Sequence, residues 1–153
     1  MNKTSLIALL LSGAFSSPVL AGPADYIFTP IVEFGEREIE FKHGSTTLPN
    51  GDHSRATVVG LGAGIKEHWF TEVSFKNKRK AGKETNLLEW ENKFQLTESG
   101  EYPVDAGLIT ELEAPLSSNT PWEAKLGGLL QTELGKWQLN SNVIFKREFA
   151  LAG

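Results

Sequence analysis

Apolar and polar side chains alternate along most of this chain, and this period of two restricts the fold more than any other feature. Within residues 86–96, Leu88 and Trp90 share one parity, whereas Glu89 and Glu91 share the other. Neighbouring residues of a strand point to opposite faces of a sheet, so the spacing predicts a strand with one apolar and one charged face. A helix built from the same residues would place acids on its apolar stripe.

Six further segments have a period-two pattern, at residues 36–43, 55–65, 69–78, 102–114, 122–134 and 137–149. In the second of these, Gly60, Gly62 and Gly64 form one face, which suits close packing inside a curved sheet. A tilted strand of about 11 to 13 residues crosses the roughly 25 Å apolar band of a membrane barrel, whereas strands of globular proteins usually have about 5 to 6 residues. We therefore predict an all-β fold, an antiparallel up-and-down transmembrane β-barrel with about 7–8 strands present.

The connections are predicted to alternate in length along the chain. Short turns are expected after Ile65, Leu96 and Leu134, and longer connections at 44–54, 79–84 and 115–121. Outer-membrane barrels have tight periplasmic turns and longer extracellular loops, so this alternation favours that class. Three aromatic residues at or beside the strand starts after the short turns are predicted to form a girdle at the membrane surface. They are Trp69, Tyr102 and Trp137.

The apolar faces are predicted to contact lipid and the charged faces to point inward, because a lysine or arginine facing the middle of a bilayer costs about 2–4 kcal/mol. The residues predicted to face the lumen are Glu72, Glu89, Glu91, Lys93, Glu111, Glu113 and Glu133. In a narrow barrel they would pair with lysines and fill the interior. In a wider barrel they would line a passive channel that favours cations.

Two other classes of function stay open. A soluble periplasmic barrel that binds an apolar ligand would share the alternation, with its apolar face inside. A lipid-modifying barrel enzyme would use serine and histidine residues in its loops. Asp52, His53 and Ser54 supply suitable groups, but adjacent residues rarely point at one another, and His43 and His53 lack a metal-ligand spacing. We therefore expect no enzyme, and predict no catalytic residue, no metal site and no cofactor.

Composition restricts the classes of molecule that the chain is expected to bind. The chain has no cysteine, which excludes disulfides and thiolate metal sites, and its net charge of -4 argues against nucleic acid. The predicted partner is outer-membrane lipid. A basic tip is predicted to contact anionic lipopolysaccharide. It comprises Lys76, Lys78, Arg79, Lys80 and Lys83.

The first residues are predicted to direct export. Lys3, an apolar run and the small-residue site ending at Ala21 are typical of a cleaved signal peptide over residues 1–21. Residues 22–153 would then form a barrel domain in the outer membrane. Bacterial barrels have even strand numbers. Seven strands therefore imply either an additional strand at 26–34 or, as we favour, that this chain is the N-terminal part of a larger barrel.

Two segments carry a resemblance to a known group of proteins. WFTEVSFK at residues 69–76 and EWENKFQLTESGEYPVDAG at residues 89–107 resemble uncharacterised proteobacterial exported proteins regarded as outer-membrane β-barrels. The resemblance covers roughly residues 25–149. It implies an outer-membrane location and a longer protein, but no activity and no catalytic residues.

Overall fold

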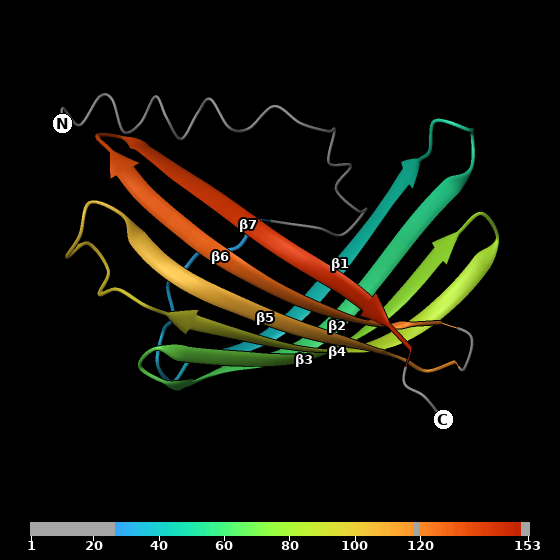
Figure 1. Cartoon of the computed structure of the whole chain (residues 1–153), viewed down its shortest axis with the longest axis horizontal. Coiled ribbons are helices and arrows are strands. Elements are labelled where there is room, and N and C mark those ends of the chain that lie inside the picture. The colour runs from blue at the N-terminus through green and yellow to red at the C-terminus, as the bar shows by residue number, and fades with distance from the viewer. Residues whose placement is uncertain (1–26, 118–119, 151–153) are drawn as a thin grey trace.

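The computed structural model describes residues 27–117 and 120–150, which form one antiparallel sheet of seven strands in chain order (Figure 1). The strands are β1 (Arg37–Thr47), β2 (His53–Lys66), β3 (Trp69–Lys80), β4 (Lys83–Gln95), β5 (Asp105–Pro115), β6 (Trp122–Leu134) and β7 (Trp137–Phe149). Within this part of the chain no helix is long and apolar enough to cross a membrane. The predicted signal peptide lies outside the described residues.

The sheet curls into a half-barrel, in which each strand pairs with its neighbours along the chain (Figure 1). The prediction of an all-β, up-and-down antiparallel fold is therefore confirmed. The sheet does not close into a ring, however, because β1 and β7 form its two edges and do not pair with each other in the described chain.

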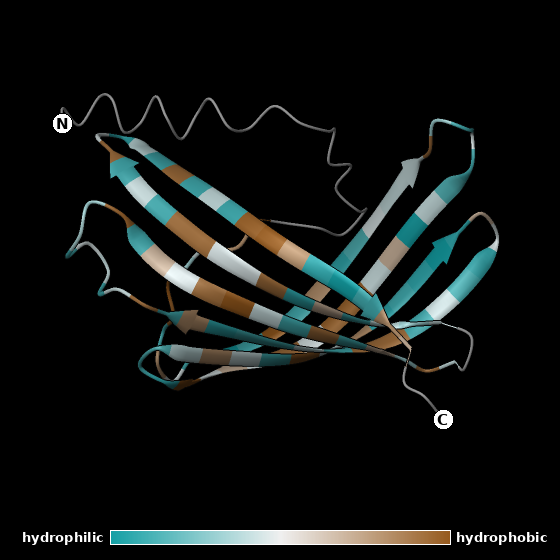
Figure 2. Cartoon of the chain, in the orientation of Figure 1, coloured by the Kyte–Doolittle hydropathy of each residue, from teal (hydrophilic) through white to brown (hydrophobic). Residues whose placement is uncertain are grey.

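The two faces of the sheet differ in polarity, as the alternating bands along each strand show (Figure 2). The convex face carries large apolar side chains that no described residue covers, with exposed fractions from 41% for Phe75 to 80% for Ile39. Its other members of this kind include Phe41, Val59, Leu61, Val73, Leu88, Trp90, Leu126, Leu130, Val143 and Phe145. The concave face carries most of the charged side chains of the strands, and six of their carboxylates are buried. The predicted separation of apolar and charged residues onto two faces is therefore confirmed.

The predicted alternation of short and long connections is wrong. β3 and β4 are joined by Ala81 and Gly82 alone, although a longer loop was expected there. Both residues have positive φ, 49° and 80°, as a two-residue hairpin turn requires. The connection 96–104, expected to be short, is longer than those at 48–52 and 116–121. It is held by Asp105, whose carboxylate accepts a hydrogen bond from the backbone N–H of Gly100 at 2.9 Å.

Residues 27–34 form a strap that crosses the concave side of the sheet, and they are not the additional strand considered for 26–34. At one end the side-chain amide of Asn142 accepts a hydrogen bond from the N–H of Phe28 and donates one to its carbonyl, at 2.9 and 3.0 Å. Further along, the N–H of Val32 donates to the side chain of Gln95 at 2.8 Å. Side chains of β7 and β4 thus form the hydrogen bonds of the strap's backbone groups at Phe28 and Val32.

The strap covers a small apolar core at one end of the concave face. Its Pro30 is fully buried, and so are Ile109 of β5 and Leu129 of β6. Gly107 makes room for this proline, because a Cβ at position 107 would lie 2.8 Å from the Cβ of Pro30. Gly64 similarly lies directly against the carbonyl of Glu33. The glycine face predicted for β2 therefore does serve close packing.

Gly64→Ala is expected to lower the free energy of unfolding by about 1–3 kcal/mol, because its Cβ would overlap backbone that cannot swing aside. Gly128→Ala is the matched control, since a Cβ there meets nothing within 4 Å. The control should be as stable as the parent chain or slightly more stable, because alanine has less backbone entropy to lose. Denaturant titration of the three proteins measures both effects, and equal destabilisation by both substitutions would contradict the packing of the strap on β2.

Candidate functional site: an acidic belt on the concave face

Nine carboxylates form an acidic belt across the middle of the concave face. Strand register places them in two adjacent rows that run across the sheet. One row contains Glu38, Glu72, Glu91 and Glu111, and the other contains Glu40, Glu89, Glu113, Glu123 and Glu148. Because all of them have the inward parity of their strands, the alternation of the sequence and the in-register pairing together produce the belt.

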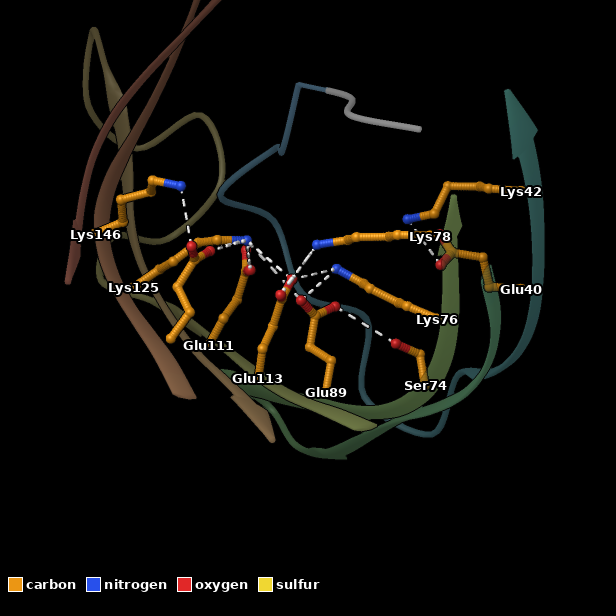
Figure 3. A network of polar contacts seen from close by, with 11 residues as sticks. Glu40, Lys42, Ser74, Lys76, Lys78, Glu89, Glu111, Glu113, Lys125 and Lys146 are labelled. Atoms are coloured by element: carbon orange, nitrogen blue, oxygen red, sulfur yellow. Dashed lines mark hydrogen bonds and ion pairs between the residues drawn. The ribbon is translucent and has the colours of Figure 1, made fainter. Parts of the chain in front are cut away.

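Two lysines lie among the central carboxylates (Figure 3). Lys76 donates hydrogen bonds to Glu89 and, at 3.1 Å, to Glu113. Lys125 donates to Glu111 at 2.6 Å, and its Nζ lies 3.5 Å from an oxygen of Glu113. The three acids are nearly buried, and each ammonium group lies close to two of them, so the lysines offset the repulsion between neighbouring carboxylates.

Three further lysines pair with acids toward the edges of the belt. Lys42 Nζ lies 2.8 Å from Glu40, Lys78 lies 3.0 Å from Glu113, and Lys146 lies 2.9 Å from Glu123. Nine carboxylates and five lysines leave the belt with a formal charge of -4 when all are ionised. The concave face therefore attracts cations.

Glu91 differs from the central acids that pair with lysine. Its side chain is buried, yet no base of the described chain lies within ion-pair distance of its carboxylate. Its cross-strand neighbours in the row are also acids, Glu72 on β3 and Glu111 on β5. Like charges directly opposite one another on a sheet repel, so the charged form of Glu91 is disfavoured unless a cation comes close to it.

Glycines of β2 determine where the Glu72 carboxylate lies. A Cβ at Gly60 would lie 2.5 Å from an oxygen of Glu72, and one at Gly62 would overlap the ring of Phe70. The Glu72 side chain therefore lies over β2, where its carboxylate comes within 4.8 Å of those of Glu38 and Glu40. Because Gly60 and Gly62 leave space over β2, the carboxylate of Glu72 on β3 comes close to those of Glu38 and Glu40 on β1.

Five of the seven residues predicted to face the lumen belong to this belt: Glu72, Glu89, Glu91, Glu111 and Glu113. Lys93 faces the same side in the next row, where its ammonium lies 5.2 Å from the centre of the Phe70 ring. Glu133 has the same parity but lies near the end of β6 and is exposed. The structure therefore brings five of the predicted residues together and leaves two outside the belt.

The oxygens of Glu38, Glu40 and Glu72 form one carboxylate group and those of Glu89, Glu111 and Glu113 form another, each with all ligand atoms within 4.8 Å. Carboxylate oxygens suit hard divalent cations. The second group is already paired with Lys76, Lys78 and Lys125, and Lys42 pairs with the first. Sequence reasoning did not find these groups, because they depend on the register between strands.

The histidines considered for catalysis or metal binding are not brought together. His43 shares a hydrogen bond with Thr57 at 2.9 Å, whereas His53 pairs in register with Thr47 near the end of β1. His53 and Ser54 follow one another in β2, so their side chains point to opposite faces of the sheet. The geometry of Asp52-His53-Ser54 therefore does not fit a catalytic triad.

The three predicted girdle aromatics lie toward the same end of the sheet. Trp69 and Trp137 begin β3 and β7, but Tyr102 lies in the connection 96–104 and not on a strand as predicted. The Trp69 ring stacks on Phe94 with centroids 6.2 Å apart, and its Nε1 donates to Asn92 at 3.1 Å. Trp137 is 76% exposed. Their role as a girdle stays a prediction.

Comparison of the chain with protein-family models, curated proteins and solved structures found no significant match. The resemblance to exported proteobacterial proteins stays a prediction. Support for a function therefore comes from the geometry of the two faces.

Lys125→Met is expected to lower the free energy of unfolding by about 3–5 kcal/mol, because it leaves buried carboxylates without their shared cation. Lys146→Met is the matched control on the neighbouring strand. Its side chain is 61% exposed, so loss of its pair with Glu123 should cost less than about 1 kcal/mol. Denaturant titration compares the two, and similar losses would contradict a central role for Lys125.

Proposed function

We propose that this chain is part of a bacterial outer-membrane β-barrel, with its convex face in lipid and its acidic belt lining a passive passage that favours cations. The observation that carries this proposal is the polarity of the two faces. The largest apolar patch on a typical soluble monomer covers roughly 300–600 Å² and is often a functional site. Here exposed apolar side chains lie on the convex side of every strand except β5, whose Leu108 and Leu112 are half-buried.

The charges on the convex face support the same placement. They are Arg37, Arg55, Arg79, Glu84 and Arg147, and each lies within three residues of a strand end. Between these ends the convex face of every strand lacks acidic and basic side chains other than His43. A band free of Asp, Glu, Lys and Arg, bounded by charges, is what a lipid-facing surface requires, because charge is far more costly at mid-bilayer than at the interface.

The open edges add a requirement to the proposal. Backbone groups in hydrocarbon must be paired, so an open sheet edge does not occur there. β1 and β7 would therefore pair with further strands in the membrane, and the half-barrel would become part of a closed wall. This agrees with the expectation of a larger barrel.

The concave face disfavours the two alternative functions. A soluble barrel that stores an apolar ligand would need an apolar interior, whereas buried carboxylates and lysines occupy the middle of this one. A lipid-modifying enzyme would need a nucleophile and a base within reach of each other. Ser54, the serine considered for that role, faces away from His53.

Val73→Lys is expected to impair insertion into phosphatidylcholine vesicles, by about 2–4 kcal/mol if the position lies at mid-bilayer. Val73 is 53% exposed in the middle of the convex face of β3. Ser45→Lys is the matched control, because Ser45 is exposed on the same face but lies in the row of Arg55, near the strand end. It should cost about 0–1 kcal/mol. The inserted fraction is measured by vesicle flotation.

If the convex face were in water, both lysines would be tolerated and the chain would remain in the soluble fraction. That result would contradict the membrane location and favour a soluble barrel.

Glu91→Gln is expected to lower the preference for cations in planar bilayers, seen as a reversal potential closer to zero in a potassium chloride gradient. The substitution removes a belt carboxyl without separating an ion pair, and recordings at about pH 9 keep that buried carboxyl ionised. Glu98→Gln is the control, because Glu98 lies in the exposed connection 96–104, where it pairs with His68. It should leave the reversal potential unchanged. If the parent chain conducts and Glu91→Gln leaves the reversal potential unchanged, the result would contradict an acidic passage. If the parent chain does not conduct at all, only a structural role would remain.

A further inference from the structure

The basic residues predicted to form one tip lie on two different faces. Lys76, Lys78, Lys80 and Lys83 have the concave parity of β3 and β4, and Lys76 belongs to the ion pairs of the belt. Arg79 lies on the convex face. Its direct cross-strand neighbour on β2 is Arg55, which has the same parity. Two guanidinium groups are therefore opposed on the outer face of one strand pair.

No described residue neutralises this arginine pair. Neither Arg55 nor Arg79 forms a hydrogen bond or an ion pair through its side chain with any residue of the described chain. The nearest acid in register is Glu84, opposite Arg79; its carboxylate accepts a hydrogen bond from Asn77 at 2.8 Å and forms no ion pair with the arginine. Like charges directly opposite on a strand pair are destabilising, so an anion between them would relieve a repulsion present in the fold.

An open pocket of about 380 Å³ lies at this position. It is lined by both arginines, by His53, by the 81–82 turn and by Gly51 and Asp52. The Asp52 carboxylate is held by the side-chain amide of Asn50 at 2.7 Å, within its own turn. The pocket is large enough for a phosphate group, and guanidinium groups bind phosphate oxygens through paired hydrogen bonds.

The convex face changes in a regular way from apolar to cationic as it approaches this pocket. In register, the pair Leu61–Val73 is followed by Val59–Phe75, then by Thr57–Asn77, and finally by Arg55–Arg79. With a rise of about 3.3 Å per residue, the arginines lie roughly 13 Å along the strands from the Val59–Phe75 pair. An amphiphile whose chains lie on the apolar rows would place its headgroup at the arginines.

We propose that Arg55 and Arg79 form a phosphate-binding site for the headgroup of a membrane lipid at the end of the convex face. The lipid source of the phosphate rests on the membrane location proposed above. The phosphate site itself rests on the opposed arginines and the pocket. Free inorganic phosphate shares the same chemistry, so the test separates the two sources.

The test measures binding of phosphatidic acid carrying a fluorophore on one acyl chain, by anisotropy, to the full chain in zwitterionic detergent micelles. The double variant R55Q/R79Q is expected to bind at least tenfold more weakly than the parent chain. The matched control K80Q/K83Q removes the same charge from the same end of the sheet, but on the concave face. It should retain the parent affinity.

Unchanged binding by R55Q/R79Q would overturn the proposal, and so would an equal loss in K80Q/K83Q, which would indicate attraction by overall charge. The single variants Arg55→Gln and Arg79→Gln, each expected to bind more weakly, keep the test decisive if the double variant misfolds. Displacement of the probe by millimolar inorganic phosphate would identify the free anion as sufficient. Arginine-dependent binding that inorganic phosphate does not displace would identify the lipid.

These outcomes are separate from those for the proposed function. Val73→Lys reports whether the convex face enters lipid, whereas R55Q/R79Q reports the phosphate site in micelles. A soluble protein that still bound inorganic phosphate through the two arginines would retain the site and lose the membrane location.

Discussion

The sharing of lysines among buried carboxylates is the interaction on which the rest of this structure depends. Lys125 lies within 4.0 Å of four acids from β4, β5 and β6, and Lys76 joins β3 to two of the same acids. Strand register aligns the belt carboxylates in two adjacent rows, and the curvature of the sheet brings their side chains closer together. Without these ammonium groups the carboxylates would repel one another. Charge pairing therefore takes the place that a hydrophobic core has in a soluble sheet protein.

Curvature and charge pairing depend on each other through the glycines. Gly60 and Gly62 let Glu72 and Phe70 lie over β2, and Gly64 lets the strap lie against the same strand. A side chain at these positions would displace Glu72, Phe70 and the strap from the concave face and reduce the curvature of the sheet. The strap then contacts β7, β4 and β2 through Asn142, Gln95 and Gly64. These contacts stabilise one end of the half-barrel, and the ion pairs of the belt stabilise its middle.

The alternation of residues predicted the strands and which residues lie on each face. Side-chain direction along a strand depends only on local geometry, and the packing of the sheet agrees with it. It placed Glu89, Glu111 and Glu113 on one face. It did not predict their meeting with Lys125, which depends on register between β4, β5 and β6. The Ala81–Gly82 turn was missed because alanine rarely adopts positive φ, so the hairpin looked like a loop. The strap could not be predicted, since its backbone is satisfied by side chains distant in sequence.

The two faces of the sheet also differ in the sign of their excess charge. The convex side carries four arginines and one glutamate near the strand ends, whereas the concave side carries the belt with its excess of carboxylates. The arginines cannot be neutralised by the belt, because side chains of opposite parity leave the sheet in opposite directions. Glu84, opposite Arg79, is the one acid among these convex charges, so the convex face keeps an excess of positive charge. In the membrane location proposed above, lipid phosphates would lie at the depth where the apolar rows end, and cations in water would approach the concave side. One alternating sequence thus creates two electrostatic environments on the two faces of a single sheet.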